Sequence, residues 1–173
     1  MQKLAPSFLA FAIVALFVAE FPYGEATDEV LADVSGLSNS KNNKTEGNGV
    51  APLKLYKRLR TWNNARKTCQ NDGGQLVVID SAQKAAIVRS LLASESLEAI
   101  WVGFHDLFRE GSWTTVTGES ISALNYYPWA HGQPDDQFGR QNCAVIWRLG
   151  LLDGMDDYRC DRKFAFVCEN KSC

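Results

Sequence analysis

The side chains best able to do chemistry are gathered in one stretch near the carboxyl end of the chain. Between residues 125 and 160 there is no Lys, there are three Arg, and the carboxylates are Asp135, Asp136, Asp153, Asp156 and Asp157. Carboxylates crowded on short loops repel one another unless solvent or a cation screens them. Oxygen atoms of Asp, Asn, Gln and the backbone are also the ligands that calcium takes. Composition leaves two interpretations open, a calcium site and an acidic, solvated loop.

The same stretch is predicted to be mostly loop. Its turn-forming residues are Pro128, Gly132, Pro134, Gly139, Gly150 and Gly154. A loop of this length inside a small domain usually carries function or is stabilised in another way. We therefore expect the regular elements around it to hold it in place.

Two short helices are predicted ahead of this loop. Trp62, Ala65 and Cys69 recur with the spacing of one helix face, and the Asn-Asp-Gly-Gly run at residues 71–74 ends that helix. Ser81 can cap a second helix, in which Ala85 begins an apolar stripe. The other apolar segments are short and β-like, at residues 75–79, 100–104, 112–116, 143–147 and 164–168. Two helices followed by a small, loop-rich sheet indicate an α+β fold.

Residues 1–26 are predicted to be a secretory signal peptide. Lys3 precedes an apolar run at residues 8–19, which at 12 residues is too short to span a bilayer, and Gly24-Glu25-Ala26 offers a cleavage point. Residues 27–52 indicate a flexible polar lead, residues 53–169 the domain itself, and residues 170–173 a tail. The expectation is a secreted, extracellular protein with no membrane span.

Charge and motif content argue against two classes of function. The chain has 18 Lys and Arg against 20 Asp and Glu, a formal net charge of −2, so it lacks the basic excess typical of nucleic-acid-binding proteins. It also contains neither a G-x-S-x-G turn nor an H-E-x-x-H helix. We expect neither a nucleic-acid partner nor an enzyme.

The cysteines of an exported chain are expected to pair. Four of the five could form two bridges in three ways, and the sequence does not choose among them; the cysteines are Cys69, Cys143, Cys160, Cys168 and Cys173. Zinc is disfavoured, since there is no C-x-x-C pair and the only histidines are His105 and His131. Asn43 and Asn170 begin Asn-x-Ser/Thr sequons and are candidate glycosylation sites.

Several short motifs occur in a fixed order along the chain. They are Trp62-x-x-Ala65-Arg66-x-x-Cys69, Gly73-Gly74-x-Leu76, Trp101-Val102-Gly103-Phe104, Gln133-Pro134-Asp135, Asn142-Cys143 and Phe166-Val167-Cys168-Glu169. Together they resemble the C-type lectin-like domain, and in particular the secreted haemolymph lectins of invertebrates such as insects, which recognise microbial glycans in innate immunity. The resemblance implies the disulfides Cys69–Cys168 and Cys143–Cys160, which leaves Cys173 either to bridge two chains into a dimer or to stay unpaired.

The resemblance also implies two groups of calcium ligands. The principal set is Gln133, Asp135, Gln141, Asp156 and Asp157, and the auxiliary set is Asp106, Glu110, Asp136 and Asn142. This chain departs from the family pattern at four places: Gln141 stands where Glu is usual, Asp156 where Asn is usual, Met155 where Trp is usual, and Asn142 where Asp is usual. The two changes in the principal set cancel in charge, so we expect its calcium binding to survive.

Sugar recognition in this family is coordination chemistry. Two vicinal hydroxyls reach the calcium while the ligand side chains hydrogen-bond those hydroxyls, and carboxylates accept whereas amides donate. Gln133-Pro134-Asp135 therefore implies a galactose-type rather than a mannose-type glycan. We expect it to contact Gln133, Asp135, Gln141 and Asp156, with Phe138 and His131 beside them. A cis peptide at Pro134 would turn its two neighbours toward one ion.

A second hypothesis comes from the same departures. Gln141 and Met155 could mark a calcium-independent, protein-binding module that kept the fold and lost the sugar.

Overall fold

The α+β fold class is confirmed. The computed structural model describes residues 29–32, 50–148 and 154–170. Two α-helices are present in these ranges, α1 (Trp62–Asn71) and α2 (Ala82–Ser94). The strands are β1 (Glu29–Ala32), β2 (Leu53–Arg60), β3 (Gly74–Leu76), β4 (Ala99–His105), β5 (Thr114–Thr115), β6 (Cys143–Trp147), β7 (Met155–Tyr158) and β8 (Phe164–Asn170). Short 3-10 turns at Ile121–Ala123 (η2) and Gln137–Gly139 (η3) interrupt the loop between β5 and β6.

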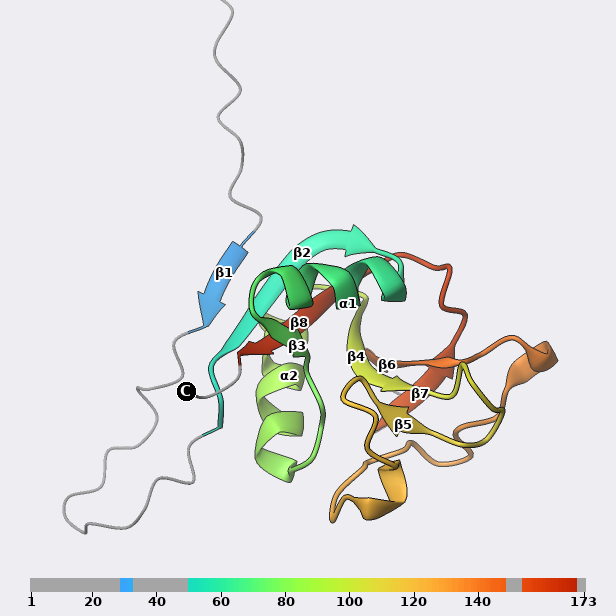
Figure 1. The fold of residues 1–173 in the computed structure, drawn as a ribbon. Coiled ribbons are helices and arrows are strands. Elements are labelled where there is room, and N and C mark those ends of the chain that lie inside the picture. The colour runs from blue at the N-terminus through green and yellow to red at the C-terminus, as the bar shows by residue number, and fades with distance from the viewer. Residues whose placement is uncertain (1–28, 33–49, 149–153, 171–173) are drawn as a thin grey trace, which may run out of the picture.

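All strands join one sheet, ordered β1-β2-β8-β4-β6-β7, with β3 added to β8 and β5 added to β4. Every pair is antiparallel except β4 with β8, which run parallel. In Figure 1 strand β8 runs between the two helices and β2 arches above α1, while β4, β6 and β7 lead away toward the long loops. The sheet thus connects a helical half to a loop-rich half.

The two helices cover opposite sides of this sheet, and each packs on it through one apolar stripe. Trp62, Ala65 and Cys69 of α1 are buried as predicted, in a cluster with Trp101 and Phe166. The buried stripe of α2 belongs to a second cluster, whose members include Ala85, Val88, Leu92, Ile100 and Val102. The predicted cap is present too, since Ser81 Oγ accepts a hydrogen bond from the Lys84 backbone N–H at 3.3 Å.

Both implied disulfides are present. Cys69–Cys168 joins α1 to β8 with a Cα–Cα distance of 5.4 Å, and Cys143–Cys160 joins β6 to the turn after β7 at 5.3 Å. The first bridge is part of the helical half. The second one fastens the two strands that border the acidic loop.

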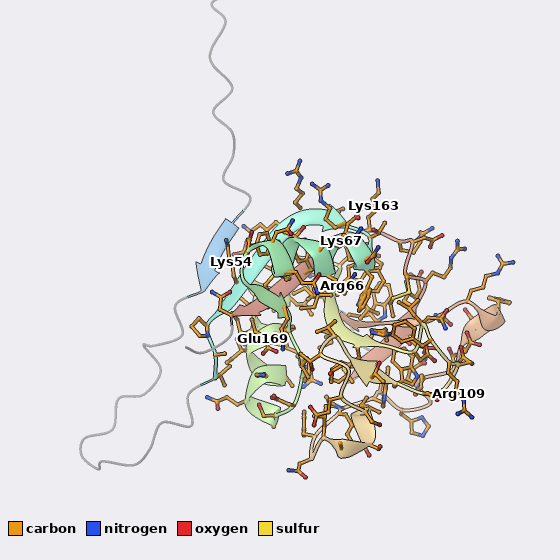
Figure 2. The ribbon with its side chains drawn as sticks, viewed as in Figure 1. Lys54, Arg66, Lys67, Arg109, Lys163 and Glu169 are labelled. Atoms are coloured by element: carbon orange, nitrogen blue, oxygen red, sulfur yellow. A yellow bond between two sulfur atoms is a disulfide. The ribbon has the colours of Figure 1, made fainter. Side chains whose placement is uncertain are left out.

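One buried ion pair ties α2 to the end of β8. Lys84 Nζ lies 2.7 Å from Glu169 Oε2 and 2.9 Å from Asp80 Oδ2, and it also donates to the Val78 carbonyl. The other Glu169 oxygen accepts from Gln75 Nε2 and from the Val78 N–H. Figure 2 places Glu169 between the end of β8 and α2. Each polar atom of the pair therefore has partners, which burial of charge requires.

Strand β1 lies inside the segment for which the sequence predicts only a flexible lead. It pairs with β2 in the register Val30 with Leu55 and Leu31 with Lys54. Pairing with an edge strand is a long-range event that the local composition of residues 27–52 does not encode.

Several expectations lie outside the described residues: the signal peptide, Asn43, Asp153 and Cys173. Asn170 is described and exposed at the end of β8. Within the described ranges, no helix has both the length and the apolar character needed to cross a membrane.

Candidate metal and ligand site

The long loop is held against β7 by backbone hydrogen bonds. The Met155 N–H donates to the Pro128 carbonyl at 2.7 Å, and the Ala130 N–H donates to the Met155 carbonyl at 2.9 Å. Gly154 allows this approach, because a Cβ there would lie 2.5 Å from the backbone nitrogen of Ala130. The start of β7 thus positions the loop just ahead of Gln133.

Asp157 holds the next part of the loop. Its Oδ1 accepts from the Asp135 N–H at 2.9 Å and its Oδ2 from the Asp136 N–H at 2.7 Å. The peptide between Gln133 and Pro134 is cis, as the sequence analysis expected. These contacts bring Gln133, Asp135 and Asp157, three members of the principal set, into one place.

The carboxylates of the principal set repel one another electrostatically. Burial raises the pKa of Asp156, and the charges of Asp157 and Asp135 raise it further, although the Trp147 indole opposes the shift. Burial also raises the pKa of Asp157, against the hydrogen bonds from the loop N–H groups and with a further rise from Asp135. A cation between these groups would relieve both effects.

Two buried oxygens of the principal set have no hydrogen-bond partner in the part of the chain that the structure describes. They are Gln133 Oε1 and Asp156 Oδ1. A buried acceptor without a donor is costly, by about 1–3 kcal/mol. Carbonyl-type and carboxylate oxygens are suitable ligands for calcium, so these two atoms fit the implied ion.

Gln141 has a different role from the others. Its side chain is buried, its Nε2 donates to the Asp157 carbonyl at 2.8 Å, and its Oε1 accepts from the Gln137 N–H. Gln141 therefore joins the loop to β7 by hydrogen bonds at both ends of its amide. Among residues 29–32, 50–148 and 154–170, no three side chains drawn from His, Cys, Asp and Glu form a metal-holding group, so amide and backbone oxygens have to complete any ligand set.

Trp147 contacts the principal set, although the sequence places it only at the end of the β-like segment 143–147. It is only partly buried, and its Nε1 donates to Asp156 Oδ2 at 2.8 Å. The contact follows from the register of β6 with β7, in which Val145 lies opposite Asp156. A Trp at the end of an apolar strand carries no local signal of that partner.

The auxiliary set is also assembled, but around an amide. Asn142 Nδ2 donates to Asp106 Oδ1 and to Glu110 Oε2, each at 3.0 Å. Asp136 Oδ1 accepts from the Gln141 N–H at 3.0 Å. Burial raises the pKa of Glu110, and the nearby charges of Asp106 and Asp136 add to the rise.

Phe138 and His131 lie on the surface of the loop. The Phe138 side chain is 87% exposed, and its backbone is left-handed, with φ of 65°. His131 is exposed as well. An aromatic ring this open to solvent, three residues after Asp135, can lie against the apolar face of a ligand.

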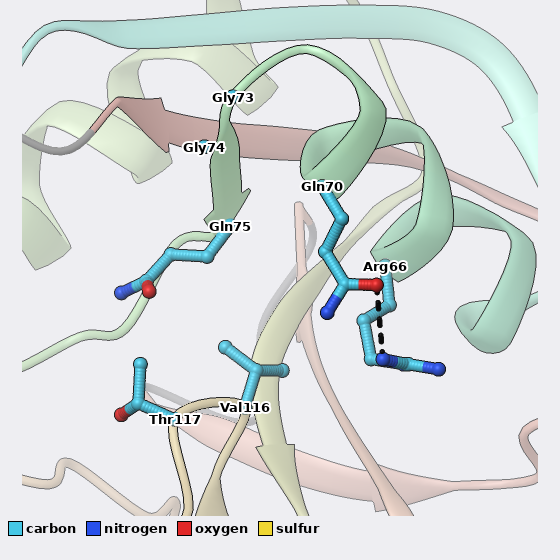
Figure 3. Close-up of a pocket in the computed structure, with 7 residues that line it drawn as sticks. All are labelled: Arg66, Gln70, Gly73, Gly74, Gln75, Val116 and Thr117. Atoms are coloured by element: carbon cyan, nitrogen blue, oxygen red, sulfur yellow. Dashed lines mark hydrogen bonds between the residues drawn. The ribbon is translucent and has the colours of Figure 1, made fainter.

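A separate hollow of about 520 Å³ lies between α1, β3 and the turn after β5 (Figure 3). It is lined by Arg66, Gln70, Gly73, Gly74, Gln75, Val116 and Thr117. Its lining includes neither an aromatic ring nor a carboxylate, and it contains none of the residues of the two ligand sets. We do not assign it to the site.

Residues 58–170 match the family model described as the lectin C-type domain. The chain belongs to the C-type lectin domain family. Proteins of this family are in general non-enzymatic binding proteins.

One relative is the hemolymph lipopolysaccharide-binding protein of Periplaneta americana, 32% identical over 67% of this chain. The match covers 47% of that relative, so the chain spans about half of its length. Among solved structures, the C-type lectin CEL-I from Cucumaria echinata has a TM-score of 0.62 at 22% identity, over 75% of this chain and 96% of that one. Human lithostathine has a TM-score of 0.60 at 27% identity, over 69% of this chain and 92% of that one. CEL-I, at its low identity, shows the fold alone.

Proposed function

We propose that the protein is a secreted lectin that binds glycans through a calcium ion held by the principal set, with a preference for galactose-type sugars. The observation that carries the proposal is the pair of buried oxygens without donors, Gln133 Oε1 and Asp156 Oδ1. They belong to the same set as the carboxylates of Asp135 and Asp157, whose charges raise the pKa of Asp156. Oxygens without donors, next to carboxylates that repel one another, are an arrangement that a hard cation stabilises.

In this proposal Gln133, Asp135 and Asp156 face the ion, and Asp157 and Gln141 position the loop through their hydrogen bonds. Calcium, when bound, supplies direct coordination of two vicinal sugar hydroxyls. The chain supplies hydrogen bonds to the same hydroxyls: the Gln133 amide donates and the Asp135 carboxylate accepts. This order of donor and acceptor, together with the family resemblance, favours galactose-type over mannose-type glycans.

Phe138 supports the sugar part of the proposal. Its exposed ring, three residues after Asp135, offers an apolar surface on the same loop. One face of a galactose ring carries C–H groups that can pack against such a ring. His131 is the second exposed ring on this loop.

Two observations support secretion and a microbial glycan. Two disulfides are typical of proteins in oxidising compartments. A relative with 32% identity is named as a hemolymph lipopolysaccharide-binding protein. We therefore propose microbial surface polysaccharide as the natural class of ligand.

A protein-binding module that needs no calcium is the second candidate, and the contacts of Gln141 favour it. The Gln141 amide donates to the Asp157 carbonyl, and the Asp157 carboxylate accepts hydrogen bonds from two loop N–H groups. These hydrogen bonds hold the loop against β7 without an ion. In this alternative the surface of the loop, rather than a bound ion, would contact the partner protein.

Asp135→Ala separates the two candidates. The Asp135 side chain is exposed and accepts no hydrogen bond from the described residues, so its removal should leave the fold intact. We expect binding to immobilised galactose in calcium to fall by at least about tenfold, because a ligand carboxylate is lost. Asp161→Ala, which removes an exposed Asp that pairs with Arg159 instead, is the matched control and should bind like wild type.

The readout is retention on a galactose matrix with and without chelator. Wild-type retention that persists in chelator, or retention by Asp135→Ala equal to that of the control, would reject the calcium-dependent mechanism. Absence of wild-type retention on galactose would favour the protein-binding module.

A further inference from the structure

The auxiliary set shows how this chain differs from its family at one position. Asn142 Nδ2 lies between two carboxylates and donates to Asp106 Oδ1 and Glu110 Oε2 at 3.0 Å each. The backbone fixes this arrangement, because the Asp106 N–H donates to the Asn142 carbonyl at 3.2 Å. One amide group therefore joins the segment after β4 to the segment before β6.

Two further oxygens of this set also accept hydrogen bonds from the backbone. Asp106 is 1% exposed, and its Oδ2 accepts from the Gly111 N–H at 2.8 Å, so both of its oxygens are satisfied. Asp136 Oδ1 accepts from the Gln141 N–H at 3.0 Å. Among the described residues, no carboxylate oxygen of Asp106, Glu110 or Asp136 is buried without a hydrogen-bond donor. Gln133 and Asp156 of the principal set each have one such oxygen.

We propose that the Asn142 amide takes the place of the auxiliary calcium, so that this end of the loop is braced by hydrogen bonds and the chain holds one calcium fewer than its family pattern implies. For a cation to enter, the Asn142 amide would have to flip, and both of its hydrogen bonds would be lost. This inference rests on the proposed function only for the principal ion. The residues of the auxiliary set are separate from Gln133 and Asp156.

An Asp at position 142 would reverse this balance. It would place a fourth carboxylate against Asp106, Glu110 and Asp136 and would remove the two donated hydrogen bonds. Carboxylates held together in this way need a cation to screen them.

The test is to count bound calcium per chain by equilibrium dialysis at saturating calcium, with the full oxidised protein. Asn142→Asp should bind one ion more than wild type. In chelator this variant should unfold at a lower temperature than wild type, and calcium should restore most of the loss. Adding Glu110→Ala to Asn142→Asp should remove the gained ion, because one carboxylate of the auxiliary set is lost. The side chain of Glu110 is exposed, so its removal should leave the fold intact.

Asn142→Ala is the matched control, because it removes the two hydrogen bonds without adding charge. It should gain no ion and should be less stable than wild type with or without calcium. Equal calcium counts for wild type and Asn142→Asp would overturn the inference. If wild type binds no calcium at all, the proposed function fails, but a difference of one ion between the two proteins would still support the Asn142 brace.

Discussion

At the scale of single residues, the site is defined by which polar atoms have donors. Gln141 and Asn142 are adjacent amides, and each uses its NH₂ group to join two segments of chain. Gln133 Oε1 and Asp156 Oδ1 are buried acceptors without such a donor. We propose that the unsatisfied oxygens mark the position of the ion and that the satisfied ones belong to the Asn142 brace.

Gln141→Glu tests the role of the Gln141 amide. The change removes the hydrogen bond to the Asp157 carbonyl and adds a carboxylate near Asp156 and Asp157. We expect the protein to be less stable in chelator and to bind calcium about tenfold more tightly, since ligand charge tunes affinity and neighbouring groups change it by this order. Calorimetric titration with calcium and thermal unfolding in chelator provide the two readouts. A variant unchanged in both would show that residue 141 does not act on the site.

At the scale of elements, α2 and β8 form the support behind the loops. Burial alone would lower the pKa of Lys84, but the hydrogen bonds and charges of Glu169 and Asp80 outweigh burial and raise it. Lys84→Met would leave Glu169 buried without its cation, so we expect a loss of about 3–5 kcal/mol in the free energy of unfolding. Glu169→Gln on the same background should recover part of the loss, since its Oε1 can still accept from Gln75 and Val78.

The pH dependence of this pair has a defined sign. Because the folded-state pKa of Lys84 is raised, its stabilising effect is fully present below the ordinary value of 10.5 and is lost as pH rises through the folded value. Denaturant unfolding at several pH values should show the gap between wild type and Lys84→Met narrowing only at strongly alkaline pH. A gap that closes near neutral pH would contradict the assignment.

The elements could be predicted from sequence where local signals exist. The Ser81 cap and the spacing of Trp62, Ala65 and Cys69 are such signals, and both helices form as expected. Strand β1 and the contact between Trp147 and Asp156 depend on strand pairing between distant segments. Local patterns do not encode such pairings, which is why the sequence did not reveal them.

The residues of the site were named from the family resemblance, but their roles needed the structure. The sequence shows that Asn142 replaces an Asp, yet only the structure shows its amide between Asp106 and Glu110. Likewise, Gln141 is expected among the ligands, and only the structure shows its amide hydrogen-bonded to the Asp157 carbonyl and the Gln137 N–H. Its place among the ligands stays a prediction.

At the scale of the whole molecule, each half contains one disulfide: Cys69–Cys168 lies in the helical half and Cys143–Cys160 in the loop-rich half. The bridges close segments of 99 and 17 residues, which the chain-entropy model values at about 4.7 and 3 kcal/mol. The shorter bridge holds β6 next to the turn after β7, and these strands carry Trp147, Asp156 and Asp157. The arrangement keeps the site in place while its loops face solvent.

The most direct test of the account is to pass the oxidised chain over immobilised galactose and immobilised mannose in calcium and then to elute with a chelator. We predict retention on galactose, little retention on mannose, and release by the chelator. Retention on neither matrix, or retention that the chelator does not reverse, would contradict it.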